Sequence, residues 1–265
     1  MKKIKAFLKC GMMVALLTGS QYLVALAMVA YKYITTDLSY EQAFDYVLAD
    51  NAVAVTYISA ALTIGVIWLI SKLRKKTFSE YIDWGKNIRG RITYACVLVG
   101  IGGNFWTTIV MNSIFSQQAV EEYNAASGNM SVTSSYLALI GVAILVPIME
   151  EIVFRGVVLS TLSKATSVEF AIILQGIIFG LMHGDIIWIC YAVFMGLILG
   201  YIKVCTGSLK AAIVMHMAYN IASPIASIIM YSFMGTSSNP EPIILLTGTF
   251  LMISGLITIY KYQPE

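Results

Sequence analysis

The sequence predicts an all-α polytopic membrane protein with about eight transmembrane helices. Of its 265 residues, 58% are hydrophobic and only 12% are charged, and the mean hydropathy is +0.80. A soluble domain carries roughly a quarter charged residues, so this chain has too little polar surface to cover itself in water. Apolar runs of about 20 residues, enough to span a bilayer as a helix, recur along the chain. The runs are continuously apolar and do not alternate, which favours helices over a β-barrel.

These apolar runs define the predicted elements in chain order. We expect membrane segments at 11–33, 51–71, 92–114, 135–160, 168–183, 187–203, 209–232 and 243–260. The start of the chain is basic, then apolar, and ends in "ALA", as a cleaved signal peptide does. The apolar character continues past Ala27 to Tyr31, however, so we expect a retained first helix.

The charges of the loops predict the orientation. Residues 72–91 hold seven Lys or Arg against two acids, whereas 36–50 hold four acids and no basic residue. Because basic loops stay on the cytoplasmic side, the N-terminus and 72–91 are expected there, and an even number of spans returns the C-terminus to the same side. We expect a multi-pass protein of a bacterial cell membrane, with the lipid bilayer as its surroundings and no nucleic-acid partner.

The predicted organisation is one structural domain with three parts. Residues 1–130 carry no charge deep in a predicted segment and are expected to be N-terminal scaffold helices. Residues 131–232 form the expected catalytic core, and 233–265 supply a C-terminal transmembrane helix. The chemistry is therefore expected after residue 130.

Five ionisable side chains lie deep in the predicted segments: Glu150, Glu151, Arg155, His183 and His216. A charged group at bilayer depth costs at least about 2.5–3.5 kcal/mol, so each needs a partner or a hydrated cavity. The chain has two histidines, and both belong to this set. Together these residues predict a dedicated polar site.

Helical spacing divides the two adjacent glutamates. Glu151 and Arg155 are four residues apart, the separation at which side chains meet on one helix face, so an ion pair is expected. Glu150 lies about 100° further around the helix and has no such partner there. We therefore expect Glu151 to be a structural support and Glu150 to be available for acid–base chemistry.

Two further pairs share this spacing, Phe179 with His183 and His216 with Asn220. His216 and Asn220 could donate together to one ligand atom, as in the stabilisation of an oxyanion. The residues alone leave three classes open: a divalent metal site, a metal-free hydrolytic site and a proton or ion relay of a transporter. The zinc-protease signature HExxH is absent, which excludes a conventional zincin.

The motifs "EEIVFR", "FGLMH" and "HMAYN" resemble those of the CAAX-processing and bacteriocin-processing (CPBP, or Abi) intramembrane protease family. That family carries EExxxR, FxxxH and HxxxN in this order, and the resemblance covers about residues 137–222. It implies a helical bundle around a hydrated intramembrane active-site cavity. It also implies an endopeptidase that acts on a hydrophobic or membrane-associated peptide or protein.

The resemblance also implies a role for each residue. Glu150 with His183 would activate the attacking water, and His216 with Asn220 would stabilise the oxyanion. Glu151 and Arg155 would brace the site, and Phe179, from the second motif, is a further support. No cofactor is certain: zinc or another divalent metal is possible at Glu150, His183 and His216, and a metal-free or metal-optional mechanism is favoured. The main alternative is a non-catalytic scaffold or bacteriocin self-immunity protein that binds a membrane partner.

One feature conflicts with ideal parallel helices. His183 falls near the end of the fifth segment that lies away from the cytoplasm. His216, by contrast, lies only about 10 Å from the cytoplasmic start of the seventh segment. The two histidines can meet only through tilt, offset or a break near Gly184, Gly176 or Gly180, and we expect such a distortion.

Overall fold

The computed structural model describes residues 2–123, 136–233 and 239–262, and within these ranges helices are the only extended regular structure. An all-α polytopic membrane fold is thereby confirmed. The predicted boundary at 130/131, the start of the segment predicted at 135 and the last three residues fall outside the described ranges. The division into 1–130, 131–232 and 233–265 stays a prediction.

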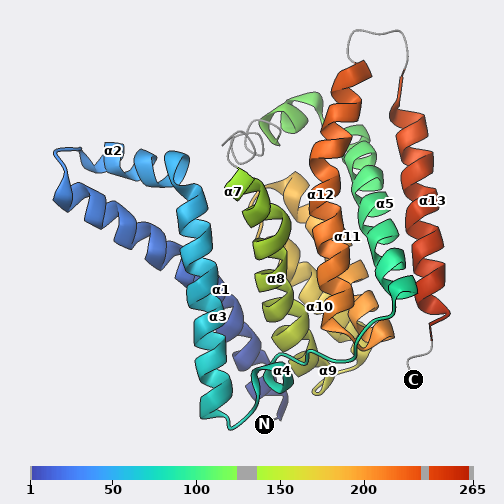
Figure 1. The fold of residues 1–265 in the computed structure, drawn as a ribbon, viewed down its shortest axis with the longest axis horizontal. Coiled ribbons are helices and arrows are strands. Elements are labelled where there is room, and N and C mark those ends of the chain that lie inside the picture. The colour runs from blue at the N-terminus through green and yellow to red at the C-terminus, as the bar shows by residue number, and fades with distance from the viewer. Residues whose placement is uncertain (1, 124–135, 234–238, 263–265) are drawn as a thin grey trace.

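Six helices of the described residues are long and apolar enough to cross a membrane. They are α1 (Lys2–Thr35), α3 (Ala52–Leu73), α5 (Gly90–Ile114), α11 (Ile186–Thr206), α12 (Leu209–Phe233) and α13 (Glu241–Tyr260). The first helix starts earlier than predicted, because the basic residues before 11 are helical too. At about 1.5 Å per residue its 34 residues exceed the thickness of the hydrocarbon core, and α1 runs slanted across Figure 1.

The other two predicted segments are helical but shorter or interrupted, so the count differs from eight. One is α10 (Val168–Leu181). The stretch 136–163 is divided by two π-helical segments into α7 (Tyr136–Ile140), η2 (Gly141–Leu145), α8 (Val146–Glu151), η3 (Ile152–Leu159) and α9 (Ser160–Ser163). The short elements α2 (Tyr40–Asp45), η1 (Tyr46–Asp50) and α4 (Phe78–Tyr81) lie in the connections.

The π-helical segment η2 leaves one carbonyl without a helical donor. The Val146 N–H donates to the carbonyl of Gly141, five residues earlier, which is the π-helical pattern. In the same register the Val142 carbonyl would receive the N–H of residue 147. That residue is Pro147, which has no N–H.

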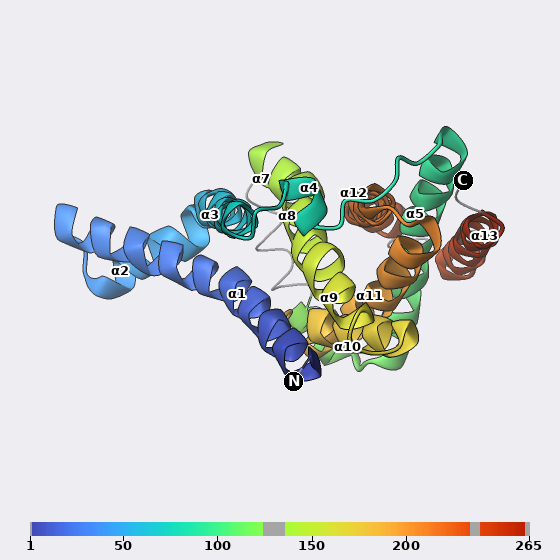
Figure 2. The ribbon, with the colours of Figure 1, turned by 90° about the horizontal axis from the view of Figure 1, so that it is seen from below.

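The helices form a bundle with a lateral arm (Figures 1 and 2). Helix α5 packs against both α12 and α13, α12 also contacts α8, and α10 pairs with α11. Helices α1, α2 and α3 extend to one side. Close approach depends on glycine: a Cβ added to Gly100 of α5 would lie 2.4 Å from the Met215 carbonyl oxygen of α12.

The predicted break between the fifth and sixth segments occurs at Gly184. Helix α10 ends at Leu181, Gly184 adopts φ of +80°, and the Asp185 carboxylate accepts from the backbone N–H groups that open α11. Gly176 and Gly180 remain inside α10, where their lack of a side chain admits α11. The break thus leaves His183 in a turn and not on a helix.

The start of α1, the connection 74–89 and the end of α13 lie at the same end of the bundle (Figure 1). The connection is fixed there by backbone hydrogen bonds from Lys86 N to Gly207 O and from Leu209 N to Trp84 O. Lys203 of α11 donates through Nζ to the Asp83 carboxylate at 2.9 Å and to its carbonyl at 2.8 Å. That this end faces the cytoplasm stays a prediction.

Candidate active site

The predicted ion pair between Glu151 and Arg155 is present at the junction of α8 and η3. Arg155 Nη1 donates to Glu151 Oε1 at 2.7 Å, and both side chains are fully buried. The guanidinium carbon lies 4.4 Å from the centroid of the Phe179 ring, where a cation–π contact adds to the pairing. Each charge is therefore compensated within a low-dielectric interior.

His216 of α12 connects the two glutamates. Its Nδ1 lies 2.9 Å from Glu151 Oε1, and its Nε2 lies 3.7 Å from Glu150 Oε2. Because a carboxylate only accepts, Nδ1 carries the proton and Nε2 is the nitrogen presented to Glu150. The Glu150 side chain is 17% exposed and that of His216 is 3% exposed. Glu150 thus has no partner on its own helix but meets one from α12.

Phe179 of α10 is the apolar centre of the site. It is fully buried and meets His183 edge to face at 4.9 Å and His216 at 5.9 Å between ring centroids. The Nδ1 of His183 lies 2.9 Å from the Phe179 carbonyl oxygen, which makes Nδ1 the donor and leaves Nε2 as an acceptor. Both histidines therefore flank the Phe179 ring. Among the described residues, His216 forms ion pairs with the glutamates and His183 does not.

Asn220 lies one turn beyond His216 on α12, and its amide is engaged. Nδ2 donates at 2.9 Å to the Val142 carbonyl, the same carbonyl that Pro147 leaves without a helical donor. This bond ties α12 to η2. The second N–H of the amide group remains for another acceptor. The shared donation of His216 and Asn220 to one ligand atom stays a prediction.

Sequence reasoning missed one polar residue of the site. Gln175 is fully buried on α10, one turn before Phe179. Its Nε2 donates at 2.8 Å to the carbonyl of Gly196, and Arg155 Nη2 reaches the same oxygen at 3.3 Å. Its spacing of four residues from Phe179 was the signal that could have identified it.

A metal ion does not fit this arrangement of donors. A catalytic zinc takes three protein ligands. Within the described ranges, no three His, Cys, Asp or Glu side chains are grouped closely enough to hold a metal ion. No step described below runs through a metal.

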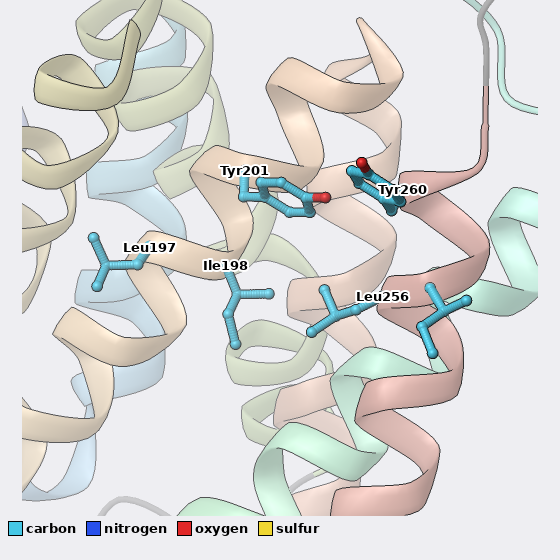
Figure 3. Close-up of a pocket in the computed structure, with 6 residues that line it drawn as sticks. Leu197, Ile198, Tyr201, Leu256 and Tyr260 are labelled. Atoms are coloured by element: carbon cyan, nitrogen blue, oxygen red, sulfur yellow. The ribbon is translucent and has the colours of Figure 1, made fainter.

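An apolar groove of about 440 Å³ lies elsewhere, between α11 and α13 (Figure 3). The groove is lined by Leu197, Ile198, Tyr201, Leu256, Ile257 and Tyr260. None of the predicted site residues lines it. Its walls are hydrocarbon apart from the tyrosine hydroxyls at one end, so it lacks groups for acid–base chemistry.

The fold and the site define a class: a multi-pass helical membrane protein whose interior joins two carboxylates, an arginine and two histidines from α8, η3, α12 and the end of α10. Residues 132–222 match the family model Rce1-like, described as type II CAAX prenyl endopeptidase Rce1-like. The matched segment is thus an Rce1-like domain, and the resemblance of the motifs to CAAX-type proteases is confirmed. All seven predicted site residues lie within it, and the match supports a peptidase function. Neither a curated protein nor a solved structure matches the chain.

Proposed function

We propose that the chain is an intramembrane endopeptidase of the CPBP type, which hydrolyses a peptide bond of a membrane-associated peptide or protein. The observation that carries this proposal is the contact between His216 and Glu150 inside an Rce1-like domain. Glu150 is the partly exposed carboxylate of the site, whereas Glu151 is fully buried and occupied by Arg155 and His216. Glu150 is therefore the carboxylate that a water molecule and a substrate can reach.

The chemistry assigned to these groups is general acid–base catalysis. A water within about 2.8 Å of both Glu150 Oε2 and His216 Nε2 fits atoms that lie 3.7 Å apart. Its oxygen attacks the scissile carbonyl carbon while Glu150 takes its proton, and His183 Nε2 is assigned as a further acceptor. Glu150 then returns the proton to the leaving amine nitrogen as the carbon–nitrogen bond breaks.

Stabilisation of the oxyanion is assigned to His216 and to the second N–H of Asn220. The Glu151 carboxylate supports this role because it fixes the orientation of the imidazole ring through Nδ1. Arg155 in turn holds the Glu151 carboxylate in place through their ion pair. We further propose a bacterial cell membrane as the location, with both termini cytoplasmic.

The test compares membrane and secreted peptides of cells that carry the wild type, Glu150→Gln or Glu169→Gln. Glu169 is an exposed glutamate of the first turn of α10 and serves as the matched control. We expect an uncleaved precursor to accumulate only with Glu150→Gln, and the purified wild type to cleave that precursor in lipid nanodiscs. Cleavage by purified Glu150→Gln at the wild-type rate would refute the proposal. If cells that carry Glu150→Gln keep the biological effect of the wild type, the alternative function of a non-catalytic binding protein would be favoured.

A further inference from the structure

Gln175 occupies a position that three glycines make possible. A Cβ added to Gly200 of α11 would lie 2.7 Å from Gln175 Nε2, and one added to Gly196 would lie 3.0 Å from the Gly176 Cα. The bare backbone of α11 therefore lets the amide of α10 reach the Gly196 carbonyl at 2.8 Å. This oxygen is buried between helices and accepts from two side chains of different elements, Gln175 and Arg155.

The bond to Gly196 orients the arginine. Arg155 Nη2 is directed to the Gly196 oxygen, and Nη1 is directed to Glu151 Oε1. Because the guanidinium is planar and rigid, fixing one nitrogen fixes the other. Glu151 Oε1 also receives His216 Nδ1, and His216 Nε2 faces Glu150. An unbroken series of contacts thus leads from Gln175 to the predicted catalytic carboxylate.

Stability alone does not account for an amide at this place. Gln175 Oε1 and Arg155 Nε are both buried, and neither has a hydrogen-bond partner within the described part of the chain. A buried polar atom without a partner destabilises the fold, and the amide carries this cost while its Nε2 donates to the carbonyls of Ile172 and Gly196. The amide at this place is consistent with a role in geometry.

We propose that Gln175 is a positioning residue, which holds Arg155 through the shared Gly196 carbonyl and thereby sets the orientation of Glu151 and His216. Its effect on catalysis rests on the proposed function, but its effect on His216 does not. The histidine can be observed directly, because the chain has only two histidines and nitrogen-15 labelling of histidine gives only two sets of ring signals.

The test records these ring signals for the purified chain in nanodiscs, with Gln175→Met and with Thr63→Val as a control. Met has nearly the length of Gln and no donor. Thr63→Val removes another buried hydrogen bond between helices, that of Thr63 to Ser20, far along the chain from Gln175. We expect the Nδ1–H signal of His216 to move in Gln175→Met and to stay in place in Thr63→Val. Unchanged His216 signals in folded Gln175→Met, or an equal change in the control, would overturn the proposal.

A second variant keeps the test usable if Gln175→Met does not fold. Gln175→Glu is isosteric and removes the donor, and its carboxylate competes with Glu151 for Arg155, so the same signal is expected to move. With the precursor identified by the Glu150→Gln comparison, kcat of the Gln175 variants should fall about tenfold or more with KM nearly unchanged. A moved signal with unchanged kcat would refute the proposed catalytic role of His216 and leave the positioning of His216 standing. Loss of activity without a moved signal would refute the positioning.

Discussion

Replacing Glu151 by glutamine is expected to destabilise the protein far more than replacing Glu150, its neighbour. The Glu151 and Arg155 side chains are both 0% exposed, and their charged atoms lie 2.7 Å apart. The substitution leaves a buried guanidinium without a counter-charge, which costs about 3–5 kcal/mol. Coulomb's law gives a similar figure. Each charge is spread over its group, so the two charge centres are about 4 Å apart, and at an effective dielectric constant near 20 they attract by about 4 kcal/mol.

Glu150→Gln lacks this penalty. The Glu150 carboxylate is partly exposed, and its contact with His216 at 3.7 Å is longer than a hydrogen bond. Its loss should change the free energy of unfolding by less than about 1 kcal/mol. Thermal unfolding of both variants in the same detergent, followed by tryptophan fluorescence at one scan rate, measures the difference. Glu150→Gln should unfold near the wild type and be inactive, and Glu151→Gln should unfold at a clearly lower temperature.

A double variant separates lost charge pairing from lost packing. Glu151→Gln combined with Arg155→Met removes both charges, so most of the stability should return while activity stays absent. Equal unfolding temperatures for Glu150→Gln and Glu151→Gln would refute the division of roles between the two glutamates. No recovery in the double variant would show that the cost of Glu151→Gln does not arise from an unpaired Arg155.

Three further predictions concern the scaffold. Partial burial raises the pKa of Asp83, but hydrogen bonds from Lys203 and from a serine hydroxyl outweigh it, so the pKa lies below its ordinary value. Its ionised form therefore stabilises the fold above about pH 4, and Asp83→Asn should lower the free energy of unfolding at neutral pH by about 1 kcal/mol, a difference that disappears as the pH falls through the lowered pKa. Gly100→Ala should destabilise the bundle because the new methyl group would meet a backbone oxygen of α12 at 2.4 Å, whereas Gly65→Ala, with nothing within 4 Å, should not; equal unfolding midpoints would contradict this. Asn220→Leu should lower the free energy of unfolding by about 1 kcal/mol or less, since it removes an exposed hydrogen bond to a carbonyl of η2, and an unchanged free energy of unfolding would argue against that bond.

The membrane segments were predictable because the length and continuity of an apolar run are visible in the sequence itself. The helices Ala52–Leu73 and Gly90–Ile114 match their predicted ranges within two residues at each end. The pairing of Glu151 with Arg155 was predictable for a similar reason, since it depends only on the pitch of one helix. Local periodicity accounts for both successes.

The contacts that complete the site were not predictable in this way. His216 meets Glu151 across 65 positions of sequence, and Gln175 meets Gly196 across 21. The second contact requires helices to approach closely at glycines, and helical periodicity does not specify which glycine faces which neighbour. The sequence paired Glu150 with His183 in its predicted role, whereas the ion-pair contact of Glu150 in the structure is with His216.

Pro147 shows that a recognisable sequence feature can be insufficient to predict which carbonyl loses its helical hydrogen bond. A proline within a helix predicts a lost hydrogen bond, and in a regular α-helix the unpaired carbonyl would be that of Ala143, four residues earlier. The π-helical register of η2 moves the unpaired carbonyl to Val142. A shift of one residue turns a carbonyl by about 100° around the helix, and the amide of Asn220 on α12 donates to it there. The role of Asn220 thus depends on a hydrogen-bond register that the packing of η2 determines, and a motif alone cannot indicate whether this amide serves the scaffold, the oxyanion or both.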